Sequence, residues 1–234
     1  MHHRTRIIAA FVGVAALLAS CAAVAVASSG GPTVTVRIEG GSRTLLPTTT
    51  VHVPGGGFIT NNGAPQGKCS ADSGAGALNV ATKGRWGGSF SSSFGDYLVT
   101  KILGKTEGGK TAYWAVLVNN VAAQTGVCGI KLHPGDRLLF AAVSLKSKGY
   151  ALTTKAPATA IAGKPFEVKV VFVNAKGVTH PLAGATVTGG GSKAMTNAKG
   201  IAKVTQAHAG KITLGAAKTG YVRAAAVTIK IRGK

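Results

Sequence analysis

Acidic residues are scarce in this chain. Among its 234 residues, 6 are Asp or Glu and 27 are Lys or Arg, so the formal net charge is +21. The carboxylates lie far apart in the sequence, which argues against the closely spaced carboxylate pair of a glycosidase. They are Glu39, Asp72, Asp96, Glu107, Asp136 and Glu167. Asp96 and Asp136 each follow a glycine, and this order is typical of turn positions.

Cysteine and the common catalytic motifs are also rare or missing. The chain has three cysteines, no Cys-x-x-Cys pair and no histidine pair with the spacing of zinc ligands. Gly-x-Ser-x-Gly, Ser-x-x-Lys and His-Glu-x-x-His do not occur. We therefore expect a protein that is not an enzyme, with no catalytic residue, no metal site and no cofactor.

Long apolar runs are confined to the amino-terminal segment. Arg4 and Arg6 precede an apolar stretch that continues to Ala27, and this order is typical of a secretory signal peptide. Small residues at 25–27 suit a signal peptidase, so residues 1–27 are predicted to be removed. An uncleaved anchor is the alternative, because about 20 apolar residues suffice to span a bilayer.

A second processing site lies inside the same run. Leu18-Ala19-Ser20-Cys21 is similar to a bacterial lipobox, in which Cys21 would be lipidated. The residues that follow Cys21 stay apolar, which favours free secretion over a lipid anchor. Both alternatives predict an extracytoplasmic protein, secreted or held at the cell surface, whose contact with a membrane is limited to an amino-terminal lipid or an uncleaved signal.

The two cysteines that remain are Cys69 and Cys128. In an oxidising compartment an isolated pair favours a disulfide bond. The chain-entropy estimate for a loop of this length is about 4 kcal/mol of stabilisation.

The positive charge indicates anionic partners and says nothing about the fold. Residues 28–150 carry twelve basic and five acidic residues, and residues 151–234 carry thirteen and one. For an exported protein we expect anionic cell-envelope polymers or glycans as partners and no nucleic acid. A solvated basic surface with no dedicated partner is the alternative.

Hydrophobic periodicity predicts a mainly β protein with two modules. A β-rich module with one short helix (28–145) is followed by a linker (146–155) and a β-sandwich (156–234). The predicted strands of the first module are 33–38, 49–54, 97–103, 112–119 and 137–143, with a helix over 77–83 and a mobile loop over 84–95. The predicted strands of the second module are 166–173, 185–188, 202–206, 211–216 and 225–231.

Two turns can be predicted from their residues. Asn119-Asn120 stands where a tight hairpin is needed, because asparagine tolerates positive φ. Pro134-Gly135 has the residue order of a type II turn that leads into the following strand.

Several motifs of the first module occur together in one known family. They are Lys68-Cys69, Gly76-Ala77-Leu78, Phe94 to Val99, Tyr113 to Asn119, Gly126-Val127-Cys128 and Gly135 to Phe140. On these motifs, residues 33–143 resemble the bacterial transcobalamin-like C-terminal domain family. The resemblance implies a β domain and supports the pairing of Cys69 with Cys128. It also implies a small-ligand, corrinoid-like binding role as an alternative function.

The second module has a resemblance of its own. Pro181 to Val187, Thr196 to Ala202, Ala209 to Leu214 and Lys218 to Tyr221 follow a strand, turn and strand order. In this, residues 156–234 resemble bacterial Ig-like and carboxypeptidase-regulatory-like modules. That resemblance implies a spacer or a surface-contacting unit.

Large aromatic residues concentrate in the first module and are the candidates for ligand contact. Trp86, Tyr97, Tyr113 and Trp114 could stack on a sugar ring, with neighbouring cations to attract an anionic glycan. Packing in the core is the alternative for Trp86 and for Trp114. The leading hypothesis is therefore an exported, non-catalytic interaction or adhesion protein.

Overall fold

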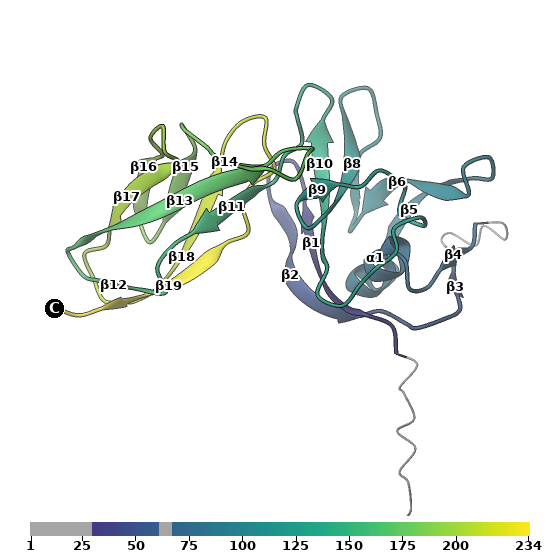
Figure 1. Cartoon of the computed structure of the whole chain (residues 1–234), viewed down its shortest axis with the longest axis horizontal. Helices are drawn as coiled ribbons and strands as arrows, with labels where there is room; N and C mark the ends of the chain where they lie inside the picture. Colours follow the sequence, from purple (N-terminus) through teal and green to yellow (C-terminus); the bar gives the residue numbers. More distant parts are fainter. Residues whose placement is uncertain (1–29, 61–66) are drawn as a thin grey trace, which may run out of the picture.

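The computed structural model describes residues 30–60 and 67–234. The chain is mainly β, with one short helix among the described residues, as the periodicity predicted. Two modules lie end to end, and the helix belongs to the first (Figure 1). The predicted signal peptide and the lipidation candidate Cys21 lie outside the described residues.

The first module, residues 30–144, is built on a five-stranded sheet of order β2-β1-β10-β8-β9, in which β1 and β10 run parallel. A separate sheet of order β5-β6-β7 and the helix α1 complete the module. The elements are β1 (Thr33–Glu39), β2 (Thr44–His52), β3 (Phe58–Ile59), β4 (Cys69–Ser70), α1 (Gly74–Thr82), β5 (Trp86–Ser91), β6 (Asp96–Ile102), β7 (Lys105–Thr106), β8 (Ala112–Val118), β9 (Val121–Ala122) and β10 (Arg137–Ser144).

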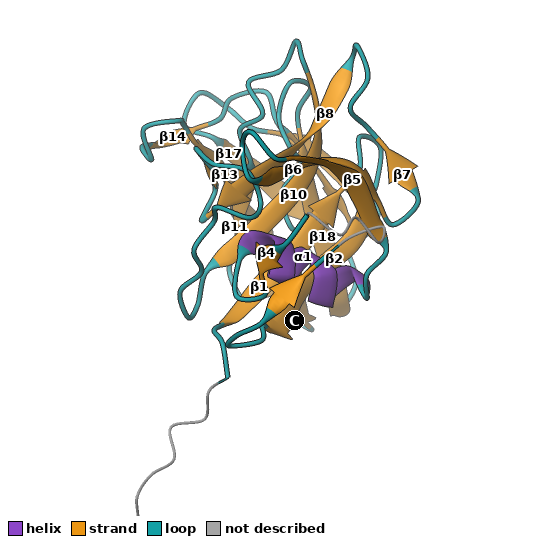
Figure 2. Cartoon of the chain, turned by 90° about the vertical axis from the view of Figure 1, so that its right-hand side faces the viewer, coloured by secondary structure: helices purple, strands orange, loops and turns teal. Residues whose placement is uncertain are grey.

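The helix α1 covers one face of this sheet (Figure 2). Ser73 caps its amino end by accepting a hydrogen bond from the Gly76 N–H at 3.4 Å, and Lys83 ends it in the left-handed region at φ 53°. Ala77 and Leu78 are fully buried against the sheet. The helix begins three residues before the predicted 77–83, because the Ser73 cap was not part of that prediction.

Both turn predictions are confirmed. Asn119 and Asn120 have φ of 52° and 70° and join β8 to β9 in a two-residue hairpin. Gly135 has φ of 85° just before β10, as a type II turn requires.

The loop predicted over 84–95 is wrong. Residues 86–91 form β5, which pairs antiparallel with β6. A side chain at Gly88 would collide with the backbone carbonyl of Leu98. Glycine is therefore required there by close backbone approach at a register shift, and its presence does not indicate a mobile segment.

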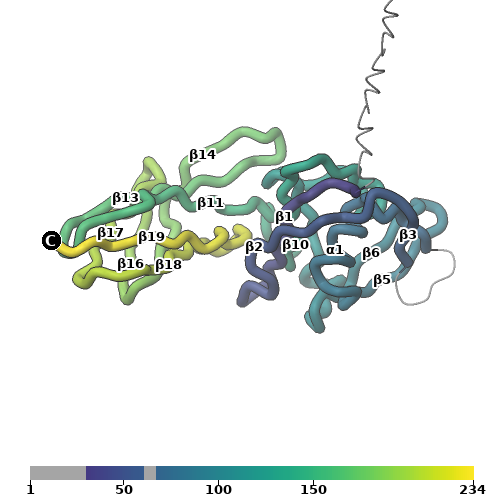
Figure 3. Tube along the Cα trace, turned by 90° about the horizontal axis from the view of Figure 1, so that it is seen from below, coloured from purple at the N-terminus to yellow at the C-terminus, as the bar shows by residue number. Residues whose placement is uncertain are grey.

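The second module, residues 150–234, consists of two facing sheets. One contains β11, β13, β14 and β17, and the other has the order β12-β19-β18-β15-β16. Seen from below, β13 and β14 lie on one side of the module and β16 and β18 on the other (Figure 3). The strands are β11 (Leu152–Lys155), β12 (Thr159–Ile161), β13 (Pro165–Val173), β14 (Thr179–Pro181), β15 (Thr186–Gly189), β16 (Ser192–Met195), β17 (Ile201–Thr205), β18 (Gly210–Ala217) and β19 (Val227–Arg232).

The predicted linker 146–155 is longer than the connection in the structure. Leu152–Lys155 forms β11, which pairs with β13, and Ala151 bridges Val222, so the last six residues assigned to the linker, 150–155, belong to the second module. Burial alternates there, since Leu152 and Thr154 are buried whereas Thr153 and Lys155 are not. The segment is too short for its alternation to stand out from a Lys- and Thr-rich loop.

The two modules share a small apolar cluster. Strand β10 is buried on both faces: Leu138 and Phe140 pack toward α1, whereas alternate residues pack toward the second module. The shared cluster comprises Leu117, Leu139, Ala141, Val143, Ala151 and Val222. Within the second module, a β-bridge between Ala151 and Val222 holds together the two residues that this module contributes to the cluster. Within the described ranges, no helix is both long enough and apolar enough to cross a membrane.

Candidate interaction sites

The four aromatic candidates do not form one exposed cluster. Trp86 and Tyr97 are buried and pack edge to face, with ring centroids 5.2 Å apart. Their polar atoms bind inside the module: the Trp86 indole donates to Asn79 at 3.1 Å and the Tyr97 hydroxyl donates to the Gly67 carbonyl at 2.6 Å. Trp114 is buried, whereas Tyr113 is 42% exposed. These contacts favour the core alternative for Trp86 and for Trp114.

The predicted disulfide is confirmed. Cys69 and Cys128 are bonded across a sequence separation of 59 residues. The carboxylate of Asp96 holds the Cys128 loop, because it accepts N–H bonds from Cys128 at 3.0 Å and from Gly129 at 3.2 Å. Asp136 similarly accepts from the His133 N–H at 2.8 Å. Both carboxylates therefore organise turns, as their glycine neighbours indicated.

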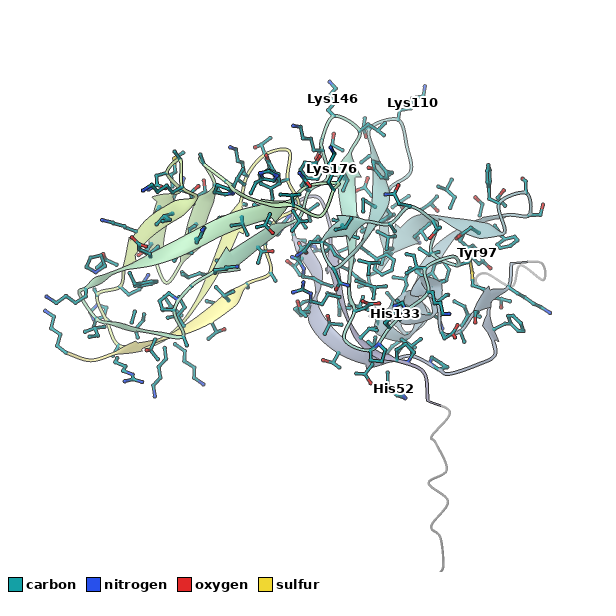
Figure 4. The ribbon with its side chains drawn as sticks, in the orientation of Figure 1. His52, Tyr97, Lys110, His133, Lys146 and Lys176 are labelled. Atoms are coloured by element: carbon teal, nitrogen blue, oxygen red, sulfur yellow. A yellow bond between two sulfur atoms is a disulfide. The ribbon has the colours of Figure 1, made fainter. Side chains whose placement is uncertain are left out.

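A groove of about 850 Å³ lies beside the disulfide and is partly lined by β6. Phe94 and Leu98 on its rim are 86% and 62% exposed. Lys68 also contributes to the rim, and Tyr97 contributes to the wall. Figure 4 shows Tyr97 close to the yellow sulfur–sulfur bond. This groove combines exposed apolar surface with one cation, Lys68, and one carboxylate, Asp96.

A second depression, of about 670 Å³, lies over β5 and β6. Its lining includes Gly87 and Gly88 together with Arg85, Lys101 and the hydroxyl groups of Ser89 and Thr100. It has no acidic residue in its lining. Trp86 also lines it but is only 4% exposed, so the ring face that the sequence suggested for stacking on a sugar is largely covered.

The charge asymmetry lies on the surface of the second module. Its single carboxylate, Glu167, is on β13 opposite Lys203 of β17. The sheet containing β12, β15, β16, β18 and β19 has no acidic residue in any of its strands. Exposed cations project from three of these strands: Lys193, Lys211, Lys230 and Arg232. The strongest positive potential of the described residues is therefore expected on this sheet.

A buried ion cluster joins the modules. Glu39 is 2% exposed and pairs with Arg37 at 2.8 Å on its own strand and with Arg223 of the second module at 3.0 Å. Thr44 donates to the same carboxylate at 2.9 Å. Arg223 also donates to the carbonyls of the 40–42 turn, at 2.8–3.1 Å. We call Arg37, Glu39 and Arg223 the junction ion cluster.

Burial dominates the electrostatics of this cluster. It raises the pKa of Glu39 above its ordinary value, against the opposing effects of Arg37, Thr44 and Arg223. Burial also lowers the pKa of Arg37, against the attraction of Glu39. The cluster was missed from the sequence because Arg37 and Glu39 alternate with apolar residues, a pattern that ordinarily indicates a solvent-facing side of a strand.

The comparisons address the first module. Residues 74–143 match a domain of unknown function, DUF4430. That family is transcobalamin-like. Comparison with curated proteins found no match.

The match indicates the fold of the first module. It does not identify a ligand or an activity, because one fold hosts many functions. It includes Cys128 and the groove-lining strand β6, while Cys69 precedes it. Among the described residues, no group of three or more His, Cys, Asp or Glu side chains is placed to hold a metal ion.

Proposed function

We propose that the protein is exported and acts at the cell surface or outside the cell as a non-catalytic interaction protein that contacts anionic envelope polymers or glycans. The observation that carries the proposal is the charge of the second module. This module has thirteen basic residues and one acidic residue. The strands of one of its two sheets carry cations and no acidic residue. Such a surface attracts polyanions over several ångströms of solvent.

The arrangement of the modules supports the same role. The junction ion cluster and the shared apolar cluster hold the second module against β10, so the basic sheet is presented at a fixed place. In this proposal the second module is an Ig-like or regulatory-like contact unit, and the amino-terminal segment directs export, with cleavage after residue 27 or lipidation at Cys21.

Co-sedimentation with purified cell walls tests the proposal. We expect the protein to pellet with walls at low ionic strength and to be released as salt is raised, because screening weakens interactions between exposed charges. Binding that is absent at low salt would contradict the proposal. Lysozyme-digested walls serve as the control for trapping in the insoluble network.

The groove beside the disulfide favours a second candidate, a small-ligand carrier of corrinoid-like specificity. Its exposed Phe94 and Leu98 offer apolar contact area, and the matched family is transcobalamin-like. Ligand binding there would perturb Tyr97, which packs on Trp86, so tryptophan fluorescence reports on the site. Titration with cobalamin that gives neither heat nor a fluorescence change would remove this candidate.

A further inference from the structure

The outer face of one sheet of the second module is a regular array of cations and hydroxyls. In β18 and β19, apolar residues such as Leu214 and Ile229 point into the core. Alternate residues therefore point outward. The outward set on β18 and β19 is Lys211, Thr213, Thr228, Lys230 and Arg232, and all of these are exposed.

The pairing register places these groups side by side. Lys211 lies directly opposite Lys230, and Thr213 lies opposite Thr228. On the neighbouring edge, Thr159 of β12 pairs with Lys230. Neighbouring strands lie about 4.8 Å apart and alternate residues about 6.7 Å apart. These positions form a small grid of donors, in which the row Thr159, Lys230 and Lys211 lies next to the row Thr228 and Thr213.

The same array continues toward the other edge. Lys193 of β16 pairs with Thr188 of β15, and Thr188 pairs with Gly215 of β18. Between Lys193 and the lysines of β18 and β19 lie threonine hydroxyls and Gly215, which do not project far from the sheet. None of the ion pairs formed within the described residues uses a cation of this face.

These features select the kind of partner. A flat grid cannot enclose a single small anion, but it can follow a chain whose charges repeat. A bilayer surface is disfavoured because the face has no aromatic anchor, and its large apolar groups, Ile161 and Met195, stand on opposite edge strands.

The type of cation also bears on which anionic polymer the face can bind. Three of the four cations are lysines, whose compact ammonium groups bind phosphate oxygens as point charges and do not need the bidentate geometry of an arginine fork. Threonine hydroxyls between the lysines add donors for phosphate oxygens.

We propose that the outer face of the β12-β19-β18-β15-β16 sheet binds a linear phosphodiester polymer of the cell envelope, with Lys193, Lys211 and Lys230 as its principal contacts. This inference rests on the proposed function and assigns its anionic partner to one face and one chemistry. The polymer crosses the strands and forms charge-assisted hydrogen bonds with several repeats at once.

Two variants of equal net charge provide the test. The face variant replaces Lys193, Lys211 and Lys230 by glutamine. The matched control replaces Lys155, Lys169 and Lys203, which are exposed on the opposite sheet. Affinity for purified poly(glycerol phosphate) is measured by calorimetry across a range of salt concentrations, and circular dichroism checks that both variants are folded.

We expect the face variant to bind at least about tenfold more weakly at low salt than the matched control. The slope of log affinity against log salt should also decrease in magnitude by about 2, on the roughly 0.7 counterions released per contact with a single-stranded polyanion. Arginine at the same three positions should retain most of the affinity, because the charge is kept.

The outcomes separate this inference from the proposed function. Equal weakening of both variants would overturn the assignment to this face while leaving polyanion binding intact. Equal or tighter binding to polygalacturonate, a carboxylate polymer, or to anionic phospholipid vesicles would overturn the phosphodiester assignment. Failure of the unaltered protein to bind walls and each of these polyanions would overturn the proposed function as well.

Discussion

Replacing Arg223 by alanine probes how the two modules are joined. In the structure this side chain pairs with Glu39 at 3.0 Å and donates to the backbone carbonyls of Gly40, Gly41 and Ser42. The substitution removes all of these contacts at once. It leaves the carboxylate of Glu39, which is 2% exposed, with Arg37 and Thr44 as its remaining partners.

The expected cost follows from the burial of the pair. Removing one partner of a fully buried ion pair costs about 3–5 kcal/mol. Arg223 is 28% exposed, so water replaces part of what is lost. We therefore expect the free energy of unfolding to fall by roughly 2–3 kcal/mol. Urea denaturation followed by tryptophan fluorescence measures it, because Trp86 and Trp114 both belong to the first module.

Arg232→Ala is the matched control, since this arginine is exposed on the second module and forms no ion pair within the described ranges. It should change stability by less than about 0.5 kcal/mol. The distribution of interatomic distances from small-angle X-ray scattering should broaden for Arg223→Ala and not for the control, because the modules lose contacts that fix their relative orientation. Equal stability and scattering of the two variants would refute a role for the junction ion cluster.

Three further outcomes are expected. Replacing both Cys69 and Cys128 by serine should lower the free energy of unfolding by about 4 kcal/mol for the loop they close; denaturation by urea, with and without reductant on the unaltered protein, checks this. Ser73→Ala should cost about 1–2 kcal/mol by removing the cap of α1, seen as a lower thermal midpoint, and a cost near zero would contradict the cap. The fold raises the pKa of Glu39, so the folded state binds this proton more tightly than the unfolded state does. The free energy of unfolding should therefore rise, relative to Glu39→Gln, as the pH falls from neutral through the raised pKa. The gain should level off below the ordinary pKa of a glutamate. A relative loss on acidification would mean that the two arginines outweigh burial.

Strand alternation made much of the fold predictable. Phe166, Val168 and Val170 alternate with polar residues in β13 and are buried as that pattern predicts. The prediction failed at β5, where glycine and serine dominate. There the strand is specified by its partner β6, and local sequence cannot display a preference that comes from pairing.

The junction could be predicted less well. The continuous apolar run 138–143 in β10 is typical of a strand buried on both faces, and it is the one local sign that something covers the second face. What covers it depends on Val222 and Arg223, roughly 80 residues further on. Such a long-range register leaves no periodic signal in either segment.

The candidate site divides in the same way. The disulfide was predictable from two isolated cysteines and a predicted oxidising compartment. The sequence could not separate ligand contacts from core residues among the aromatic candidates, because the residues that surround Trp86 and Trp114 in the sequence suit both roles. The basic sheet face needed the pairing register that sets Lys211 beside Lys230.

Fractionation of the native host measures the central claim most directly. The account predicts that the protein is found in the envelope or medium, that its two remaining cysteines are oxidised, and that wall-bound material is released by high salt. Native protein in the cytosol with Cys69 and Cys128 as free thiols would contradict it.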